Sequence, residues 1–184
     1  MERIRMHIEE LTGAECLTIL EHTNLARLAC SRDDQPYIVP IYVDFDGHAL
    51  YSFSMHGLKI DWMRLNPSVC VEVDDIIDQY NWTTVVVFGR YEELKDTPEY
   101  ETLRDRAAEL FRHRPEWWLP AVGRVSSHEP RQVPVVFRIR VKSVHGRRAV
   151  RDETAAAVTD RRVRRASDTA PRWWIQVLRA KRRH

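Results

Sequence analysis

Residues 50–74 read LYSFSMHGLKIDWMRLNPSVCVEVD, and this stretch decides the fold more than any other part of the chain. It begins as a strand, which the turn His56-Gly57 interrupts. The following residues fit a short helix that must end before Pro67, because proline restricts the backbone of the residue before it. A second strand follows. The order strand, turn, helix, strand places the cation Lys59 beside exposed strand ends.

The residues before this stretch predict two further strands. LARLACS (25–31) and PYIVPIYVDF (36–45) are rich in apolar and β-branched residues, and the polar turn 32–35 separates them. Asp46-Gly47 supplies the positive φ of a tight hairpin that leads into HALYSFS (48–54). Three antiparallel strands therefore follow one another through short turns.

The residues after it complete a set of six strands. SVCVEVD (68–74) is the fourth, and DDIIDQYN (74–81) forms an acidic and polar link. TTVVVFGRYEEL (83–94) is strongly β-branched, with Gly89 as a candidate bulge. PVVFRIRVKSVHG (134–146) alternates apolar and polar residues and closes the set.

Two more helices are expected. From Glu9 to Thr23 the apolar residues recur at helical spacing, and Thr12 and Glu15 have the offset of a capping box. Thr97 can cap a later helix that has proline in its first turn and runs to Phe111. Six short strands joined mainly by hairpins favour a small antiparallel barrel over a parallel sheet, although periodicity leaves a β-sandwich open.

The charge distribution divides the 184-residue chain into two parts. Residues 147–184 hold 12 Lys and Arg against 4 Asp and Glu, a net charge of +8, which leaves −6 on the first 146 residues. We expect a mostly disordered linker after residue 146, then a short basic amphipathic helix at 171–183. This tail could contact nucleic acid or a membrane surface, but docking on the acidic body of the same chain is favoured.

Other sequence features limit the classes of function. No signal-peptide run and no membrane-length apolar stretch is found, so a soluble, cytoplasmic protein is expected. The eight histidines and three cysteines lack metal-ligand spacing, and the cysteines lie in apolar surroundings. Buried reduced thiols and no metal are therefore the expectation.

Together, PYIVPIYVDFDG (36–47), residues 50–74 and NWTTVVVFGRYEEL (81–94) resemble the pyridoxamine 5'-phosphate oxidase-like flavin-binding split barrels, particularly the branch that includes nitroimidazole-resistance reductases. The resemblance implies a mainly β fold with flanking helices, in which residues 1–146 form a six-stranded antiparallel split β-barrel. It also implies FMN as the cofactor, held at the interface of a homodimer.

The resemblance further implies roles for individual residues. Lys59, in the turn Gly57-Leu58-Lys59, would contact the flavin phosphate, and the run Val39-Pro40-Ile41-Tyr42 would lie alongside the isoalloxazine. Phe53 stands where the nitroimidazole-resistance relatives have a histidine. The implied cofactor-binding residues are Lys59, Pro40, Ile41, Tyr42, Ser52, Phe53, Ser54 and, reaching the flavin from the second subunit, Trp82, Thr83 and Thr84.

The residues alone leave simpler interpretations open. Lys59 could be a solvated lysine, Pro40 could protect a sheet edge, and Trp82 could pack in the core or at an interface. The leading hypothesis is an FMN-dependent oxidoreductase that acts on a small planar molecule, with no residue assigned as catalytic acid or base. The alternatives are a non-catalytic flavin, haem or deazaflavin carrier, and a binding module whose basic tail contacts nucleic acid or membrane.

Overall fold

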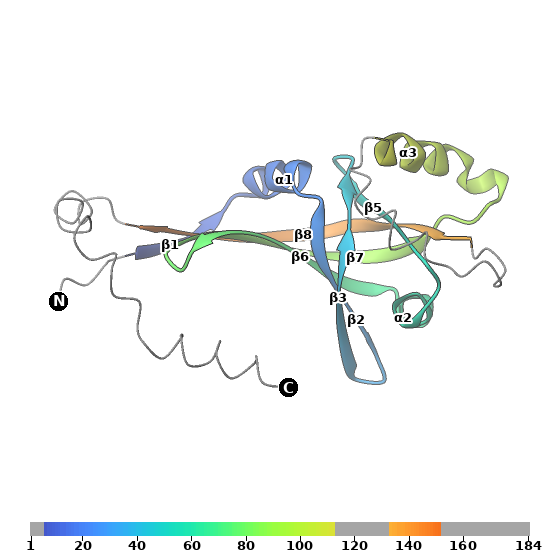
Figure 1. The fold of residues 1–184 in the computed structure, drawn as a ribbon, viewed down its shortest axis with the longest axis horizontal. Helices are drawn as coiled ribbons and strands as arrows, with labels where there is room; N and C mark the ends of the chain where they lie inside the picture. Colours follow the sequence, from blue (N-terminus) through green and yellow to red (C-terminus); the bar gives the residue numbers. More distant parts are fainter. Residues whose placement is uncertain (1–5, 113–132, 152–184) are drawn as a thin grey trace, which may run out of the picture.

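The computed structural model describes residues 6–112 and 133–151, and in these ranges one antiparallel sheet of eight strands is flanked by three α-helices and a 3-10 turn (Figure 1). The strands are β1 (Met6–Leu11), β2 (Leu25–Arg32), β3 (Gln35–Tyr42), β4 (Asp44–Phe45), β5 (Ala49–Ser54), β6 (Ser68–Asp78), β7 (Asn81–Glu93) and β8 (Val135–Arg151). The helices are α1 (Gly13–His22), α2 (Leu58–Leu65), the 3-10 turn η1 (Pro98–Tyr100) and α3 (Glu101–Phe111).

The sheet has the order β3-β2-β6-β7-β8-β5-β4, and β1 pairs with β8 beyond the end of β5. One edge of β8 therefore pairs with β7, while its other edge is shared between β5 and β1. The sheet is elongated, with α2 near one end and β1 at the other (Figure 1). We call the β1 end the arm, which consists of residues 6–11, 74–84 and 144–151; the rest of the sheet is the barrel end.

The barrel end closes around a fully buried apolar core. Residues from facing strands, including Leu28, Val71, Val87 and Phe137, are completely shielded from solvent there. The Ser52 hydroxyl donates a 2.6 Å hydrogen bond to the carbonyl oxygen of Tyr42 and joins β5 to the end of β3. This link lies where the sheet order leaves the two outer strands without a ladder, as in a split barrel.

Several sequence predictions are confirmed. The side chain of Thr12 accepts from the Glu15 backbone, and the Glu15 carboxylate accepts from the Thr12 N–H, which completes the capping box. Gly89 lies at a register shift between β7 and β8. A Cβ at Gly89 would stand 2.5 Å from the side chain of Ile139 and 2.9 Å from a backbone carbonyl oxygen, so a side chain does not fit.

The expected count of six strands is wrong, because β1 and β4 are additional strands. The first helix begins at Gly13 rather than Glu9, since residues 6–11 pair with β8. Glu9 and Glu10 face arginines across that pairing, with Arg148 3.2 Å from Glu9 and Arg147 3.8 Å from Glu10. Strand pairing at long range therefore overrides the local helical pattern.

Two further expectations differ from the structure. The polar link 74–81 is mostly strand, because β6 continues to Asp78 and turns directly into β7. Thr97 precedes η1 but makes no side-chain cap. The expected boundary at 146 falls inside β8, which continues to Arg151; the remainder of the tail, including the expected helix at 171–183, lies outside the described residues.

Candidate functional site

The turn that carries Lys59 presents an anion-binding geometry. No side chain caps the start of α2. The Ile60 and Asp61 N–H groups donate to the Gly57 carbonyl oxygen, so the open first-turn N–H groups among the described residues are those of Leu58 and Lys59. The Lys59 side chain is half-buried near the Cys30 thiol, and neither an ion pair nor a hydrogen bond links it to any residue in the ranges 6–112 and 133–151. Burial lowers the pKa of Lys59. An unpaired, partly desolvated cation beside open N–H groups fits a phosphate.

Space for a ligand exists directly at this turn. A Cβ at Gly57 would meet no atom within 4 Å, and its φ of 167° is extended backbone that any residue can adopt. Neither backbone strain nor close packing among the described residues therefore requires a glycine at position 57. A ligand can approach the turn on that side.

Strand β5 brings one of its predicted residues to the same region. Ser54 is half-buried, ends β5 shortly before the turn and donates its hydroxyl to the Met55 carbonyl oxygen at 2.9 Å. The Ser52 side chain is buried and committed to Tyr42. Phe53 points to the opposite face of the strand, where its ring meets that of Phe111 on α3 at 5.1 Å. Ser54 is thus better placed than Ser52 or Phe53 to face a ligand at the Lys59 turn.

Strand β3 is the edge of the sheet, and its predicted residues divide between its faces. Pro40 is exposed on this edge, where a missing N–H removes no ladder bond, as the sequence predicted. Ile41 is buried in the core, and Tyr42 is half-buried. Pro40 and Tyr42 therefore remain accessible to a ligand or a partner, whereas Ile41 is chiefly a core residue.

The three predicted residues of β7 lie at the other end of the molecule. Ser54 pairs with Val135 on β8, whereas Thr84 pairs with Arg147 on the same strand. At about 3.4 Å per residue, the two positions are separated by about 40 Å along β8. Ser54 and Thr84 are therefore far apart along β8. Lys59 lies near Cys30 on β2, and the neighbouring Ala29 is linked through Cys70 to Phe88 in the middle of β7.

Thr83 and Thr84 also face opposite sides of the sheet. Thr84 donates to the Glu72 carboxylate at 3.2 Å. Thr83 lines a groove of about 610 Å³ between α1 and the arm, together with His22, Asp75 and Arg148. The two hydroxyls are not directed at one ligand.

Residues 12–148 match the sequence profile of the pyridoxamine 5'-phosphate oxidase family. The chain belongs to this family. Three similar proteins illustrate the family. An uncharacterized protein of Rhizobium meliloti is 45% identical over 115 residues, which are 62% of this chain and 76% of that protein. A FAD-binding protein of Mesorhizobium loti of known structure is 39% identical, with a TM-score of 0.65 over 79% of this chain and 98% of that one.

A Bacteroides thetaiotaomicron protein, provisionally a 5-nitroimidazole antibiotic resistance protein, shares the fold. Its TM-score is 0.54 at 16% identity, covering 83% of this chain and 97% of that one. At this identity the likeness concerns the architecture alone. The split-barrel arrangement predicted from residues 50–74 is therefore that of the pyridoxamine 5'-phosphate oxidase family.

Two other cations of this chain, Arg27 and Arg138, are paired with carboxylates. Arg27 lies 2.8 Å from Asp74 and 3.4 Å from Glu72, so it is not an open phosphate ligand. Arg138 donates to Glu92 at 2.6 Å. Lys59, by contrast, has no carboxylate partner within residues 6–112 and 133–151, so it is more open to an anion than these two arginines.

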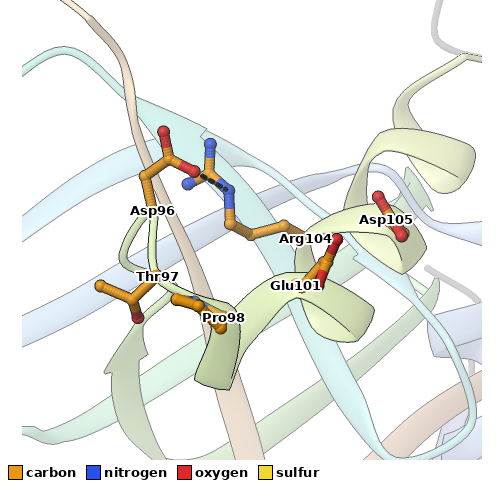
Figure 2. Close-up of a pocket in the computed structure, with 6 residues that line it drawn as sticks. All are labelled: Asp96, Thr97, Pro98, Glu101, Arg104 and Asp105. Atoms are coloured by element: carbon orange, nitrogen blue, oxygen red, sulfur yellow. Dashed lines mark ion pairs between the residues drawn. The ribbon is translucent and has the colours of Figure 1, made fainter.

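A second concave surface lies at the start of α3. Figure 2 shows this pocket of about 310 Å³, where Arg104 faces Asp96 at 3.6 Å. Arg104 also donates to the Leu94 carbonyl oxygen at 2.8 Å, so it holds the start of α3 against the end of β7. None of the ten predicted site residues lines this pocket.

Neither a metal-binding cluster nor a membrane-spanning helix occurs within residues 6–112 and 133–151. In that part of the chain no group of three or more His, Cys, Asp and Glu side chains is arranged to hold a metal ion. No helix there is long and apolar enough to cross a membrane. Cys16 and Cys30 are buried and Cys70 is half-buried, all three as free thiols whose pKa is raised by burial.

Proposed function

We propose that this chain is a flavin-binding protein that forms a cytoplasmic homodimer and acts as a flavin-dependent oxidoreductase on a small planar molecule. The observation that carries the proposal is Lys59, a half-buried cation without a carboxylate partner in the described residues, beside the uncapped start of α2. The ammonium group of Lys59 and the open N–H groups at the start of α2 would both donate hydrogen bonds to a terminal phosphate of the flavin. Ser54 would stand beside its ribityl chain.

The partner subunit would supply what one chain lacks. Trp82, Thr83 or Thr84 of the partner subunit would reach a flavin at the Lys59 turn, whereas Thr84 of the same chain lies about 40 Å from Ser54 along β8. The separation is therefore an argument for a site that is shared between subunits. A strict monomer would contradict this site.

An apolar row on the arm supports a contact between subunits. Ile8, Ala149, Trp82 and Ile76 stand directly opposite one another across four strands, so their side chains share one face. Ile8 is 53% exposed and Ile76 is 67% exposed. Ala149 is buried and Trp82 is half-buried, so the row is open at its two ends. Exposed apolar side chains at these ends would be covered in a contact between subunits, and Trp82 links the row to the proposed site.

FMN is the proposed cofactor, because the Lys59 turn offers a compact site for one terminal phosphate. The Mesorhizobium loti relative is a FAD-binding protein, which makes FAD the competing candidate for this chain. Releasing the bound cofactor from purified protein by heat and identifying it by mass spectrometry separates the two. A haem or deazaflavin in that extract would instead support the carrier alternatives.

A bound flavin would supply hydride exchange at its ring, and the protein would position the planar substrate and exclude water. No described side chain is assigned here as a catalytic acid or base. The proposed reaction class therefore rests on binding and orientation.

Subunit mixing tests the proposal directly. Lys59→Ala and Trp82→Ala homodimers should each bind FMN weakly, because each lacks one half of both sites. Mixed dimers should regain binding at one site, since the intact Lys59 and the intact Trp82 then meet across the interface. If mixing restores no FMN binding after subunit exchange has been verified, the shared site is wrong.

A further inference from the structure

Arg64, in the last turn of α2, is clamped to the end of β7. Its Nε lies 2.8 Å from Glu93 Oε2, and its Nη2 lies 2.9 Å from Glu93 Oε1, which is a two-pronged contact. The Tyr91 hydroxyl donates to the same carboxylate at 3.0 Å. The Arg64 side chain is 43% exposed and that of Glu93 is 20% exposed, so only the carboxylate of this ion pair is largely shielded from water. Two parallel hydrogen bonds fix the orientation of the guanidinium group as well as its distance from the carboxylate.

The remaining terminal nitrogen of Arg64 reaches back to the start of α2. Its Nη1 lies 3.1 Å from Nε2 of His56, the residue just before Gly57. The same His56 nitrogen lies 3.0 Å from the Asp61 carboxylate in the first turn. One guanidinium group thus connects β7 with the residues on both sides of the Lys59 turn.

The charges of this cluster are satisfied internally. Hydrogen bonding from Arg64 holds the pKa of Glu93 below its ordinary value, although burial opposes this shift. Burial and the neighbouring Glu93 raise the pKa of Tyr91. Nε and Nη2 of Arg64 donate to Glu93, and Nη1 faces His56 Nε2, which accepts from Arg64 only when it does not donate to Asp61. Arg64 is thus engaged by Glu93, whereas Lys59 on the same helix is unpaired among the described residues.

We propose that Arg64 is a positioning residue for the flavin phosphate: its two-pronged contact with Glu93 fixes α2 so that Lys59 and the open N–H groups point to one place. This inference rests on the proposed function. The physical reason is that α2 has eight residues and no side-chain cap at its start, so contacts along the helix must set its direction. A small rotation of such a helix misplaces donors that must converge on one phosphate.

The test compares FMN with riboflavin, which has the same ring and ribityl chain but no phosphate. Arg64→Met should weaken FMN binding by about tenfold and riboflavin binding by less than about twofold, measured by flavin fluorescence quenching. Arg64→Lys keeps the charge but loses the planar fork, so it should also lose FMN selectivity. The exchange Arg64→Glu with Glu93→Arg should restore part of it.

Arg138→Met is the matched control, because Arg138 is paired with Glu92, the neighbour of Glu93 on β7, but does not touch α2 in the described contacts. It should leave the ratio of FMN to riboflavin affinity unchanged. Equal weakening of both flavins by Arg64→Met and Arg64→Lys, with folding verified by circular dichroism, would make the role of Arg64 purely structural and overturn the inference. If Lys59→Ala abolishes the preference for FMN while both Arg64 variants keep it, the proposed function stands and only this inference fails. If the unaltered protein binds neither flavin, both fail.

Discussion

The two ends of the sheet are stabilised in different ways. At the barrel end, helix α2 buries Ile60 and Met63 completely and is anchored to β7 by the two-pronged, partly shielded pair of Arg64 and Glu93. In the arm, β1 exposes both of its faces along nearly its full length. Its ion pairs are open to water, with the Glu10 side chain 85% exposed and that of Glu9 45% exposed.

The difference assigns different tasks to the two ends. A buried core and a partly shielded ion pair hold groups in fixed directions, which a phosphate site requires. Exposed strands with an apolar row on one face are suited to contact with another subunit. The predicted site residues are distributed over both ends, and the proposed shared site would bring them together across two subunits.

The largest expected effect concerns the barrel end. Lys59→Ala should weaken FMN binding by about a hundredfold, since a charge-assisted contact to phosphate contributes about 1.5–3 kcal/mol. Fluorescence titration measures the loss. Lys95→Ala, which removes an exposed lysine from the same end, is the control. Equal affinities for the two variants would remove the anion site from the start of α2.

The next effect concerns stability, and it compares two glycines. Gly89→Ala should lower the free energy of unfolding by about 2 kcal/mol, because its Cβ would clash with Ile139 and with backbone at the β7–β8 bulge. Gly57→Ala should change it by less than about 0.5 kcal/mol, as the site is open and its backbone extended. Urea unfolding measures both. A tolerated Gly89→Ala would mean that the bulge rearranges readily.

The pH dependence of binding sharpens the role of Lys59. Its ammonium must be protonated to hold a phosphate, and burial lowers its pKa. FMN affinity should therefore decline as the pH rises through that lowered pKa, at a lower pH than an ordinary lysine would require. Lys59→Arg stays charged as the pH rises and should abolish the decline. A decline that persists in Lys59→Arg would have to arise from another group.

The smallest effect concerns the arm. Glu9→Gln removes an exposed partner of Arg148 and should change the free energy of unfolding by less than about 0.5 kcal/mol. Thermal unfolding at low and high salt measures it. A loss above about 1 kcal/mol would show that the arm depends on its ion pairs much as the barrel end depends on its core.

The sequence by itself determined the local elements. The alternation of residues 50–54, the break at His56-Gly57 and the restriction before Pro67 define the strand, turn and helix that carry Lys59. Gly89 and the capping box at Thr12 are equally local, because backbone geometry and neighbouring donors decide them. These features follow from residues a few positions apart.

Only the tertiary structure decided which groups are free and which lie together. Arg64 and Glu93 are 29 residues apart, and no sequence pattern indicates their contact. The pairing of β1 with β8 replaced a predicted helical start by a strand, and the register of β8 separated Thr84 from Ser54. Local propensity fixes what a segment can become, whereas long-range pairing and burial determine its neighbours. In the described part of the chain, those neighbours give carboxylates to Arg27 and Arg138 but none to Lys59.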